Sequence, residues 1–366
     1  MKINLIFFLP NFSKGGAANS IVKLSKNLDK SKYIIYLISL NKNEYKVDTK
    51  NNKNIKFIRI NTSRAIFSIF KLRNLVKNLL RNNIFKTIFI SNIHYANIIA
   101  ILALYKIPKI KLIVTERTSI EELRIYKNIY EYFKKKILIF LISRLYRFSD
   151  KIVSNSRFVA HDLKKITNKN IMIIYPPSIK FIYKNKPKKI KNIFRIIYIG
   201  RLSEEKGVDL IIKALSNFKN KKFLLKIIGE GPQMKYLKNL TNKLMLNKNI
   251  KFLGYQENTD KFYKTSNLFI NASYFEGMPN AIIEAINFSV PLICSNAKGG
   301  TSEVLRNGKI GDLFESGNDK DLYRKILNHF NNPKLLTKKV SMFRDDLKNY
   351  TQIENLKNYK SLFEKI

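Results

Sequence analysis

Two glutamates, Glu276 and Glu284, stand eight residues apart in the sequence. Glu276 follows an apolar run, and Pro279 can occupy the first turn of a helix, which places Glu284 about one and a half turns into that helix. A carboxylate in an apolar helix needs partners, and sugar or ribose hydroxyls would supply them. A nearby Lys or Arg would satisfy Glu284 as well, in a purely structural role.

A second group of polar residues contains two cations. Gly200 and Arg201 follow an apolar run, and Lys206 comes shortly after them, near the start of a helix. Arg holds phosphate oxygens bidentately and Lys supplies a point charge, so the group could bind a diphosphate. For Lys206 alone, a solvated lysine in a lysine-rich chain is the competing explanation.

Glycine pairs open several of the expected helices, at Gly15-Gly16 and Gly299-Gly300. Glycine lets backbone N–H groups approach an anion at a helix start, although a plain tight turn explains each pair equally well. The stretch Gly229-Glu230-Gly231 matches part of a dinucleotide-binding fingerprint, but Met234 stands where the third glycine belongs. That departure argues against a dehydrogenase.

Short apolar runs alternate with helical segments, which predicts parallel sheets covered by helices on both faces, the doubly wound α/β arrangement. In the first half the predicted strands are Ile3–Leu9, Tyr33–Leu40, Ile55–Ile60, Thr87–Ser91, Lys111–Thr115, Lys151–Ser154 and Ile171–Ile174. In the second half they are Phe194–Ile199, Phe223–Ile228, Ile250–Leu253, Leu268–Asn271 and Pro291–Cys294. From about Asp321 onward the sequence predicts helices only.

The alternating pattern divides the chain into two α/β domains. Residues 1–177 form the first, residues 193–349 the second, and a lysine-rich linker containing Pro187 spans 178–192. A C-terminal helix at 350–366 is expected to pack back on the first domain. Ligands of such sheets bind at the carboxyl ends of the strands, where the polar groups described above lie.

The formal net charge is +43. Such a charge favours an anionic partner, either nucleic acid or a membrane surface, but a protein from an AT-rich genome would show the same Lys and Asn excess. The single cysteine, Cys294, excludes an intrachain disulfide and reads as part of a buried strand. We find no convincing secretory signal and no apolar run long enough to span a bilayer.

Residues 134–148 are basic at both ends and apolar between. This pattern fits a helix lying in a bilayer interface, and it fits a core helix with cationic ends equally well.

Taken in order along nearly the whole chain, these stretches resemble glycosyltransferase family 4. That resemblance implies the GT-B fold, in which two Rossmann-like domains face a central cleft, and metal-independent transfer with retention of anomeric configuration. Catalytic roles are implied for Glu276, Arg201, Lys206 and Glu116. Donor binding is implied for a set comprising Gly15, Gly16, Gly200, Arg201, Lys206, Gly229, Glu276, Gly277, Met278, Pro279, Asn280 and Glu284. In it Arg201 and Lys206 would hold the diphosphate, Glu276 the donor sugar and Glu284 the ribose.

The acceptor side departs from the family pattern. Many members carry a His where this chain has Glu116 and Arg117, so these two residues and the nearby His94 are the acceptor-side candidates. His161 and His329 lie in lysine-rich helical stretches and are expected at the surface. Three scattered histidines and one cysteine predict no metal site, and the Asp-x-Asp at Asp319 is expected to cap a helix.

The sequence therefore predicts a retaining glycosyltransferase. It would move a hexose or N-acetylhexosamine from a nucleotide-sugar, most simply a UDP-sugar, to a glycan or polyprenyl-linked acceptor in cell-surface glycoconjugate synthesis. The expected location is the cytoplasm or the cytoplasmic face of the inner membrane, with peripheral association to anionic lipid, no cofactor and no nucleic-acid partner. Two alternatives stay open: a basic nucleic-acid-binding protein, and another nucleotide-dependent Rossmann enzyme.

Overall fold

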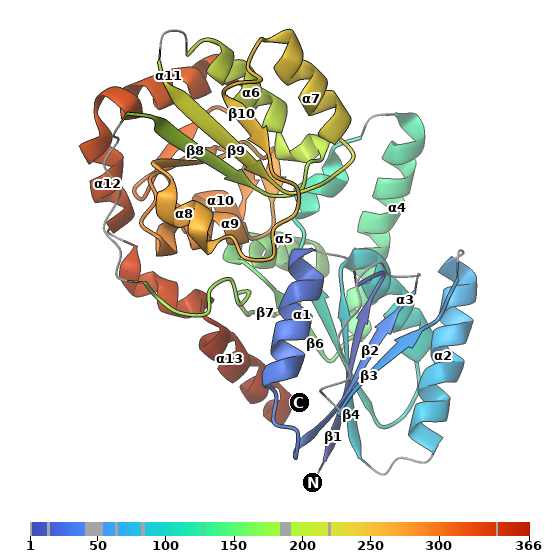
Figure 1. Ribbon diagram of the computed structural model, residues 1–366. Helices are drawn as coiled ribbons and strands as arrows, with labels where there is room; N and C mark the ends of the chain where they lie inside the picture. Colours follow the sequence, from blue (N-terminus) through green and yellow to red (C-terminus); the bar gives the residue numbers. More distant parts are fainter. Residues whose placement is uncertain are drawn as a thin grey trace. The chain divides into compact units, whose positions relative to one another are not determined.

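The structure, a computed structural model, describes residues 2–12, 15–40, 54–62, 65–81, 85–126, 128–183, 192–218, 221–341 and 343–366. The chain divides into two compact units (Figure 1). The first comprises Met1–Pro177 and Gln352–Ile366, and the second comprises Ser178–Thr351. Residues 184–191 of the expected linker lie outside the described residues.

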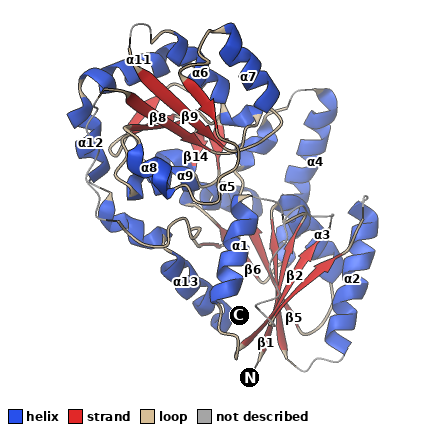
Figure 2. Cartoon of the chain, in the orientation of Figure 1, coloured by secondary structure: helices blue, strands red, loops and turns tan. Residues whose placement is uncertain are grey.

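The first unit is built on a seven-stranded parallel sheet, shown in red in Figure 2, with the order β3-β2-β1-β4-β5-β6-β7. Its strands are β1 (Ile3–Leu9), β2 (Tyr33–Ser39), β3 (Ile55–Arg59), β4 (Lys86–Asn92), β5 (Ile110–Glu116), β6 (Lys151–Ser154) and β7 (Ile171–Ile173). Its helices are α1 (Gly16–Asn27), α2 (Ala65–Arg81), α3 (His94–Leu104), η1 (Ile120–Arg124), α4 (Ile129–Leu145), η2 (Tyr146–Phe148), α5 (Arg157–Thr167) and α13 (Gln352–Lys365).

Every residue of the central strand β1 is buried, because the sheet has a hydrophobic core on each face. Alternate side chains of a strand point to opposite faces. Ile6 and Phe8 pack into the core that includes residues of α2 to α5, whereas Leu5 and Phe7 pack into the core that includes residues of α1 and α13. A continuous apolar run is thus the pattern that a doubly covered parallel sheet requires.

The second unit repeats this plan with a six-stranded parallel sheet in the order β10-β9-β8-β11-β13-β15. Its strands are β8 (Phe194–Ile199), β9 (Phe223–Ile228), β10 (Ile250–Phe252), β11 (Leu268–Asn271), β13 (Leu292–Ser295) and β15 (Asp312–Phe314). A separate pair consists of β12 (Phe275–Glu276) and β14 (Lys298–Gly299). The helices are η3 (Glu204–Lys206), α6 (Val208–Ser216), α7 (Met234–Lys243), α8 (Asp260–Thr265), α9 (Asn280–Asn287), α10 (Gly300–Val304), α11 (Asp319–Asn331), α12 (Pro333–Ser341) and η4 (Arg344–Tyr350).

Each main sheet reverses its strand order at its centre. In the first sheet β1 lies between β2 and β4, and in the second β8 lies between β9 and β11. The connections leaving such neighbouring strands run to opposite sides and open a crevice at the carboxyl edge, where α/β proteins bind ligands. The loops after β1, β4, β8 and β11 therefore occupy the binding position of each unit.

All strands predicted from the sequence are confirmed, with shifts of a residue or so at several ends. The prediction missed β15, which is short and begins with an aspartate, and the two-residue strands β12 and β14. The expectation of a surface position for His329 is wrong. His329 is buried on α11 against the ring of Phe194, with its Nε2 3.3 Å from the carbonyl oxygen of Asn267, and burial lowers its pKa.

Candidate active site

The principal polar contact of the second unit joins Lys206 to Glu276 across the centre of its sheet. Lys206 ends η3, in the loop that follows β8, and Glu276 lies in β12, just after β11. The Lys206 Nζ donates to Glu276 Oε1 at 2.8 Å, and the Ser273 hydroxyl donates to the same oxygen at 2.8 Å. Both charged side chains are mostly but not completely covered. A carboxylate and an ammonium group thus lie together at the point where the strand order reverses.

The backbone around Glu276 is fixed by two neighbouring loops. The Tyr274 N–H donates to the Glu205 carbonyl oxygen at 2.9 Å, which ties this segment to η3. In the β12–β14 pair Glu276 lies opposite Gly299, whose φ is +132°. A Cβ atom on Gly299 would lie 1.9 Å from the Glu276 carbonyl oxygen. The glycine pair of the sequence therefore serves here to let β14 approach the glutamate.

Arg201 leaves the end of β8 with an exposed side chain. Its carbonyl oxygen accepts a hydrogen bond of 2.9 Å from the hydroxyl of Tyr198, a buried residue whose pKa is raised by burial and by the charges of Glu276 and Glu205. Gly229 comes directly after β9, and its backbone lies against the loop after β8. A Cβ atom on Gly229 would lie 1.9 Å from the Gly200 carbonyl oxygen. The loops after β8 and β9 are thus packed backbone to backbone, and the guanidinium group extends into solvent.

Glu284 lies on α9, and its Oε2 accepts a hydrogen bond of 3.0 Å from the hydroxyl of Tyr263. The residues that lead into this helix are covered, with Met278 and Pro279 buried and Gly277 half-buried. Asn280 accepts a hydrogen bond of 2.8 Å from the Ser178 hydroxyl. Glu284 itself is half-buried.

In the first unit the carboxylate of Glu116 ends β5 and is fully buried. The Tyr146 hydroxyl donates to its Oε2 at 3.0 Å, and the Arg117 N–H donates to its Oε1 at 3.1 Å. Asn97 in turn donates to the Tyr146 oxygen at 2.9 Å and accepts from the Ser91 hydroxyl at 2.6 Å. This chain of hydrogen bonds holds the Glu116 carboxylate in one orientation.

Two further acceptor-side candidates lie beside Glu116. His94 begins α3 and is buried, with its Nδ1 3.7 Å from Glu116 Oε1. Burial alone would lower the pKa of His94, but the nearby Glu116 carboxylate outweighs burial and raises that pKa. The Nε of Arg117 donates to the Asn92 side-chain oxygen at 3.0 Å. The structure therefore brings His94, Glu116 and Arg117 together at the ends of β4 and β5.

The remaining first-unit candidates, Gly15 and Gly16, begin α1. Gly15 has an extended backbone and offers no side-chain cap to the helix, and a Cβ atom there would meet nothing within 4 Å. The preceding residues 13 and 14 lie outside the described residues. Among the described residues there is room for a side chain at position 15, so packing does not require glycine there.

Three residues that hold the candidate carboxylates were not assigned a role from the sequence. Ser273 lies three positions before Glu276, so its place in the same loop was a usable signal. Tyr263 and Tyr146 lie on other elements, 21 and 30 residues from the glutamates that they bind. Such distances carry no local spacing pattern, and only the tertiary structure identifies these partners.

Three other observations bear on the site. In the described residues no group of three or more His, Cys, Asp or Glu side chains is placed to hold a metal ion. None of the described helices has both the length and the apolar character needed to cross a bilayer. A helix begins at Asp319 as expected, but its cap is Asn318, whose Oδ1 accepts from the Asp321 N–H at 3.0 Å, and Asp319 and Asp321 lie in the first turn of α11.

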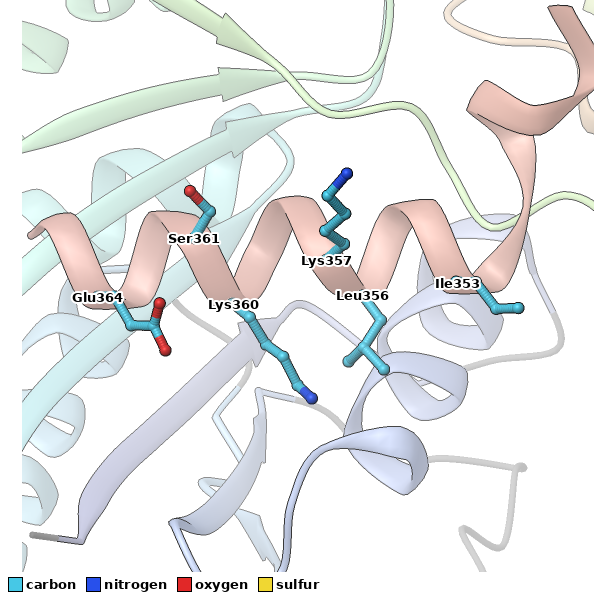
Figure 3. Close-up of a pocket in the computed structure, with 6 residues that line it drawn as sticks. All are labelled: Ile353, Leu356, Lys357, Lys360, Ser361 and Glu364. Atoms are coloured by element: carbon cyan, nitrogen blue, oxygen red, sulfur yellow. The ribbon is translucent and has the colours of Figure 1, made fainter.

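A hollow of about 450 Å³ lies along α13 (Figure 3). Its described lining comes from that helix alone, with the side chains of Ile353, Leu356, Lys357, Lys360, Ser361 and Glu364. The one carboxylate among them, Glu364, is paired with Lys32 at 2.8 Å. This hollow therefore lacks the convergent polar groups found at the carboxyl edges of the two sheets.

Solved structures with the same two-unit plan define the class. HepE of Anabaena, determined in complex with UDP, superposes over 100% of both chains with a TM-score of 0.79 at 16% identity. Such similarity establishes the fold, which is that of the GT-B glycosyltransferases.

The sequence comparisons establish the family. Residues 14–177 match the model of "Glycosyltransferase Family 4", and residues 180–350 match that of "Glycosyl transferases group 1". The chain therefore belongs to the family 4 glycosyltransferases, and the resemblance seen in the sequence is confirmed.

Two relatives illustrate the range of the family. An N-acetylgalactosaminyltransferase of Campylobacter jejuni, whose name gives a diphospho-undecaprenol-linked sugar as acceptor, is 28% identical over 340 residues, which are 90% of each chain. An uncharacterized glycosyltransferase of Methanocaldococcus jannaschii is 34% identical over 189 residues, 46% of this chain and 45% of its own.

Proposed function

We propose that this glycosyltransferase moves a hexose or N-acetylhexosamine from a UDP-sugar to a glycan or polyprenyl-linked acceptor, with retention of anomeric configuration and without a metal ion. The observation that carries the proposal is the contact of Lys206 with Glu276 at the centre of the second sheet. The UDP bound by HepE and the undecaprenol-linked acceptor named for the Campylobacter jejuni relative support the choice of substrates.

The proposed chemistry follows from the charges at this position. Lys206 and the exposed Arg201, both in the loop after β8, would bind the donor diphosphate and stabilise the negative charge that grows on the diphosphate as its bond to the sugar breaks. Glu276 would accept hydrogen bonds from sugar hydroxyls, and Glu284 from those of the ribose. Gly200, Gly229 and the backbone from Gly277 to Asn280 would form the wall of the donor site.

For transfer with retention, the acceptor hydroxyl would attack the anomeric carbon on the face that the diphosphate leaves. The C–O bond to the diphosphate breaks, the new C–O bond forms, and the departing phosphate oxygen takes the proton of the hydroxyl. Arg117 and His94 would contact the acceptor or the donor sugar, and the buried Glu116 would orient His94 beside them. Gly15 and Gly16 would let α1 approach the phosphates. We place the enzyme at the cytoplasmic face of the membrane that carries the acceptor.

A thermal-shift screen tests the donor site. The protein in EDTA is titrated with UDP, GDP and ADP, and we expect UDP to raise its melting temperature, since a ligand at 100 times its Kd adds about 2.7 kcal/mol to stability. Lys206→Ala should abolish most of that shift. The matched control is Lys213→Ala, which removes a lysine from a 2.8 Å ion pair with Asp209 in the same unit and should keep the shift.

Two outcomes would reject the proposal. An undiminished UDP shift in Lys206→Ala would mean that the diphosphate binds elsewhere. A shift with RNA or DNA but with no nucleotide would favour the nucleic-acid-binding alternative.

A further inference from the structure

The long helix α4 of the first unit has apolar side chains that are exposed to solvent. Its residues Ile129, Tyr130, Phe133, Ile137 and Phe140 are 58–73% exposed. Because a helix turns about 100° per residue, these five fall within one arc on its outer side. Leu138 and Ile142 are its fully buried residues. One face of α4, the teal helix of Figure 1, packs into the core of the first unit through Leu138 and Ile142, as the core-helix prediction requires. Its outer face is apolar and exposed, which the core-helix prediction does not explain.

The same outer arc of α4 carries cations and no carboxylate. Lys134, Lys136 and Arg144 are exposed between and beside the apolar residues. The single acidic residue of the helix, Glu131, lies off this arc with Lys135 at 3.6 Å. We call these eight exposed residues the α4 face: Ile129, Tyr130, Phe133, Lys134, Lys136, Ile137, Phe140 and Arg144.

Exposed aromatic rings paired with cations also occur next to the α4 face. Arg144 lies over the ring of Phe140 at 5.6 Å, and Lys134 lies over the exposed ring of Tyr95 at 5.7 Å. Beyond the helix end, Arg147 lies over the exposed ring of Phe148 at 5.0 Å. Alternating aromatic and cationic groups suit the boundary of a bilayer, where rings enter the acyl region and ammonium or guanidinium groups meet lipid phosphates.

We propose that the α4 face docks the enzyme onto an anionic lipid bilayer, with α4 lying in the plane of the membrane. The helix has 17 residues, about 26 Å, and its cations are distributed along that length, so it lies on the surface. The inference deepens the proposed use of a polyprenyl-linked acceptor by naming the surface that reaches the membrane. The biological purpose of the docking rests on that proposed function, but the docking itself can be tested without measuring sugar transfer.

Charge selects the bilayer over other occupants. In a symmetric dimer two copies of the same patch would face each other, each with the cations Lys134, Lys136 and Arg144 and no carboxylate to neutralise them. A nucleic-acid duplex would neutralise the cations and leave five large apolar side chains against its polar backbone. An anionic bilayer satisfies both kinds of side chain at once.

The direct test uses the full chain and vesicles of phosphatidylcholine with 30% phosphatidylglycerol, in a flotation assay. A Phe133→Ser, Ile137→Ser, Phe140→Ser variant should lose more than about tenfold in partitioning, because the apolar area buried in the acyl boundary drives interfacial binding. The control replaces Phe67 and Phe70, exposed aromatic residues of α2, with Ser and should bind like wild type.

General attraction of a strongly basic protein to anionic lipid needs its own control. Lys134→Glu, Lys136→Glu, Arg144→Glu lowers the formal charge as much as Lys235→Glu, Lys238→Glu, Lys243→Glu, which changes exposed lysines of α7. We expect the α4 variant to bind far more weakly than the α7 variant. Equal losses in the two variants would overturn the proposal.

The chain contains no tryptophan, so a single introduced one reports its own surroundings. With the vesicles, the indole of Phe140→Trp should shift its emission to the blue and be quenched by lipids brominated along the acyl chain. Tyr236→Trp, on the exposed face of α7, should do neither. A water-like emission from the Phe140→Trp variant while the protein floats with the vesicles would show docking by another surface and overturn the proposal. A dimer that forms in the wild type but not in the Phe133→Ser, Ile137→Ser, Phe140→Ser variant would also overturn the proposal, because the α4 face would then bind a second copy of the chain.

The UDP melting shift, measured on the same serine variant, separates the two proposals. If it persists while vesicle binding is lost, both stand. If it is absent from every form of the protein while vesicle binding depends on the α4 face, only the donor assignment fails.

Discussion

At the scale of single residues, the two units hold their candidate carboxylates by different means. Glu276 is held by the Lys206 ammonium group and the Ser273 hydroxyl, and it stays partly open to solvent. Glu116 is fully buried and is held by a tyrosine hydroxyl and backbone N–H groups. A buried carboxylate needs such donors to remain in the fold. The first arrangement can exchange its partners for a ligand, whereas the second orients a fixed group.

The contact between His94 and Glu116 makes stability depend on pH. The pKa of His94 is raised in the folded protein, because the nearby Glu116 outweighs the effect of burial. Its stabilising contribution is therefore complete below the unfolded value of about 6.5 and is lost as the pH rises through the folded pKa. We expect the melting temperature of wild type to exceed that of His94→Gln by more at pH 5.5 than at pH 8.5.

The control for this measurement is His161→Gln, which changes an exposed histidine of α5 in the same unit. Because it removes a histidine that is not beside Glu116, its difference from wild type should depend on pH less than that of His94→Gln does. A difference for His94→Gln that grows toward alkaline pH would contradict the pKa shift and its assigned cause.

At the scale of elements, the short pair β12–β14 decides where Glu276 lies. Gly299→Ala would place a methyl group against the Glu276 carbonyl oxygen and would strain a backbone with φ of +132°. Since a displacement of about 1 Å can lower a rate by a factor of about 100, we expect at least that loss in the release of UDP from the UDP-sugar donor. The measurement is kcat/KM for UDP release.

Gly308→Ala is the matched control for that variant. Gly308 also has a positive φ, +88°, but a Cβ atom there would make only ordinary contacts at 3.7 Å and beyond. It should lose about 1–2 kcal/mol of stability and keep its turnover. If the two variants lose turnover equally, backbone strain rather than the position of Glu276 explains the effect.

Much of the fold could be predicted from the sequence, because the strands are short, mostly apolar runs separated by helical segments. The sites at strand ends followed from the same reasoning, as Lys206 and Glu276 show. The β12–β14 pair could not be predicted, since Gly299 meets Glu276 through backbone contacts that leave no side-chain pattern. His329 was misplaced because a lysine-rich helix does not reveal which of its faces packs against Phe194.

At the scale of the whole molecule, the chain leaves the second unit and completes the first. Helix α13 follows directly on Thr351, the end of the second unit, yet it belongs to the first. Its residues Tyr359, Leu362 and Phe363 are buried in the core beside β1 and β2. The carbonyl oxygen of Tyr175 accepts a 2.6 Å hydrogen bond from Asn355. The first unit therefore reaches its full stability only when the end of the chain is in place.

Replacing Phe363, the most deeply buried residue of α13, tests this dependence. Phe363→Ala removes the ring that packs edge-on against Tyr33 with centroids 6.1 Å apart, and should cost about 3–5 kcal/mol of the free energy of unfolding. Hydrogen exchange measured by mass spectrometry should accelerate in β1 and β2 and stay unchanged in β8 and β9. Ile353→Ala, on the same helix but 74% exposed, should alter neither region. Equal acceleration in both sheets would mean that α13 stabilises the second unit as well. If the amide protons of β1 stay protected in Phe363→Ala, the first unit does not depend on this helix.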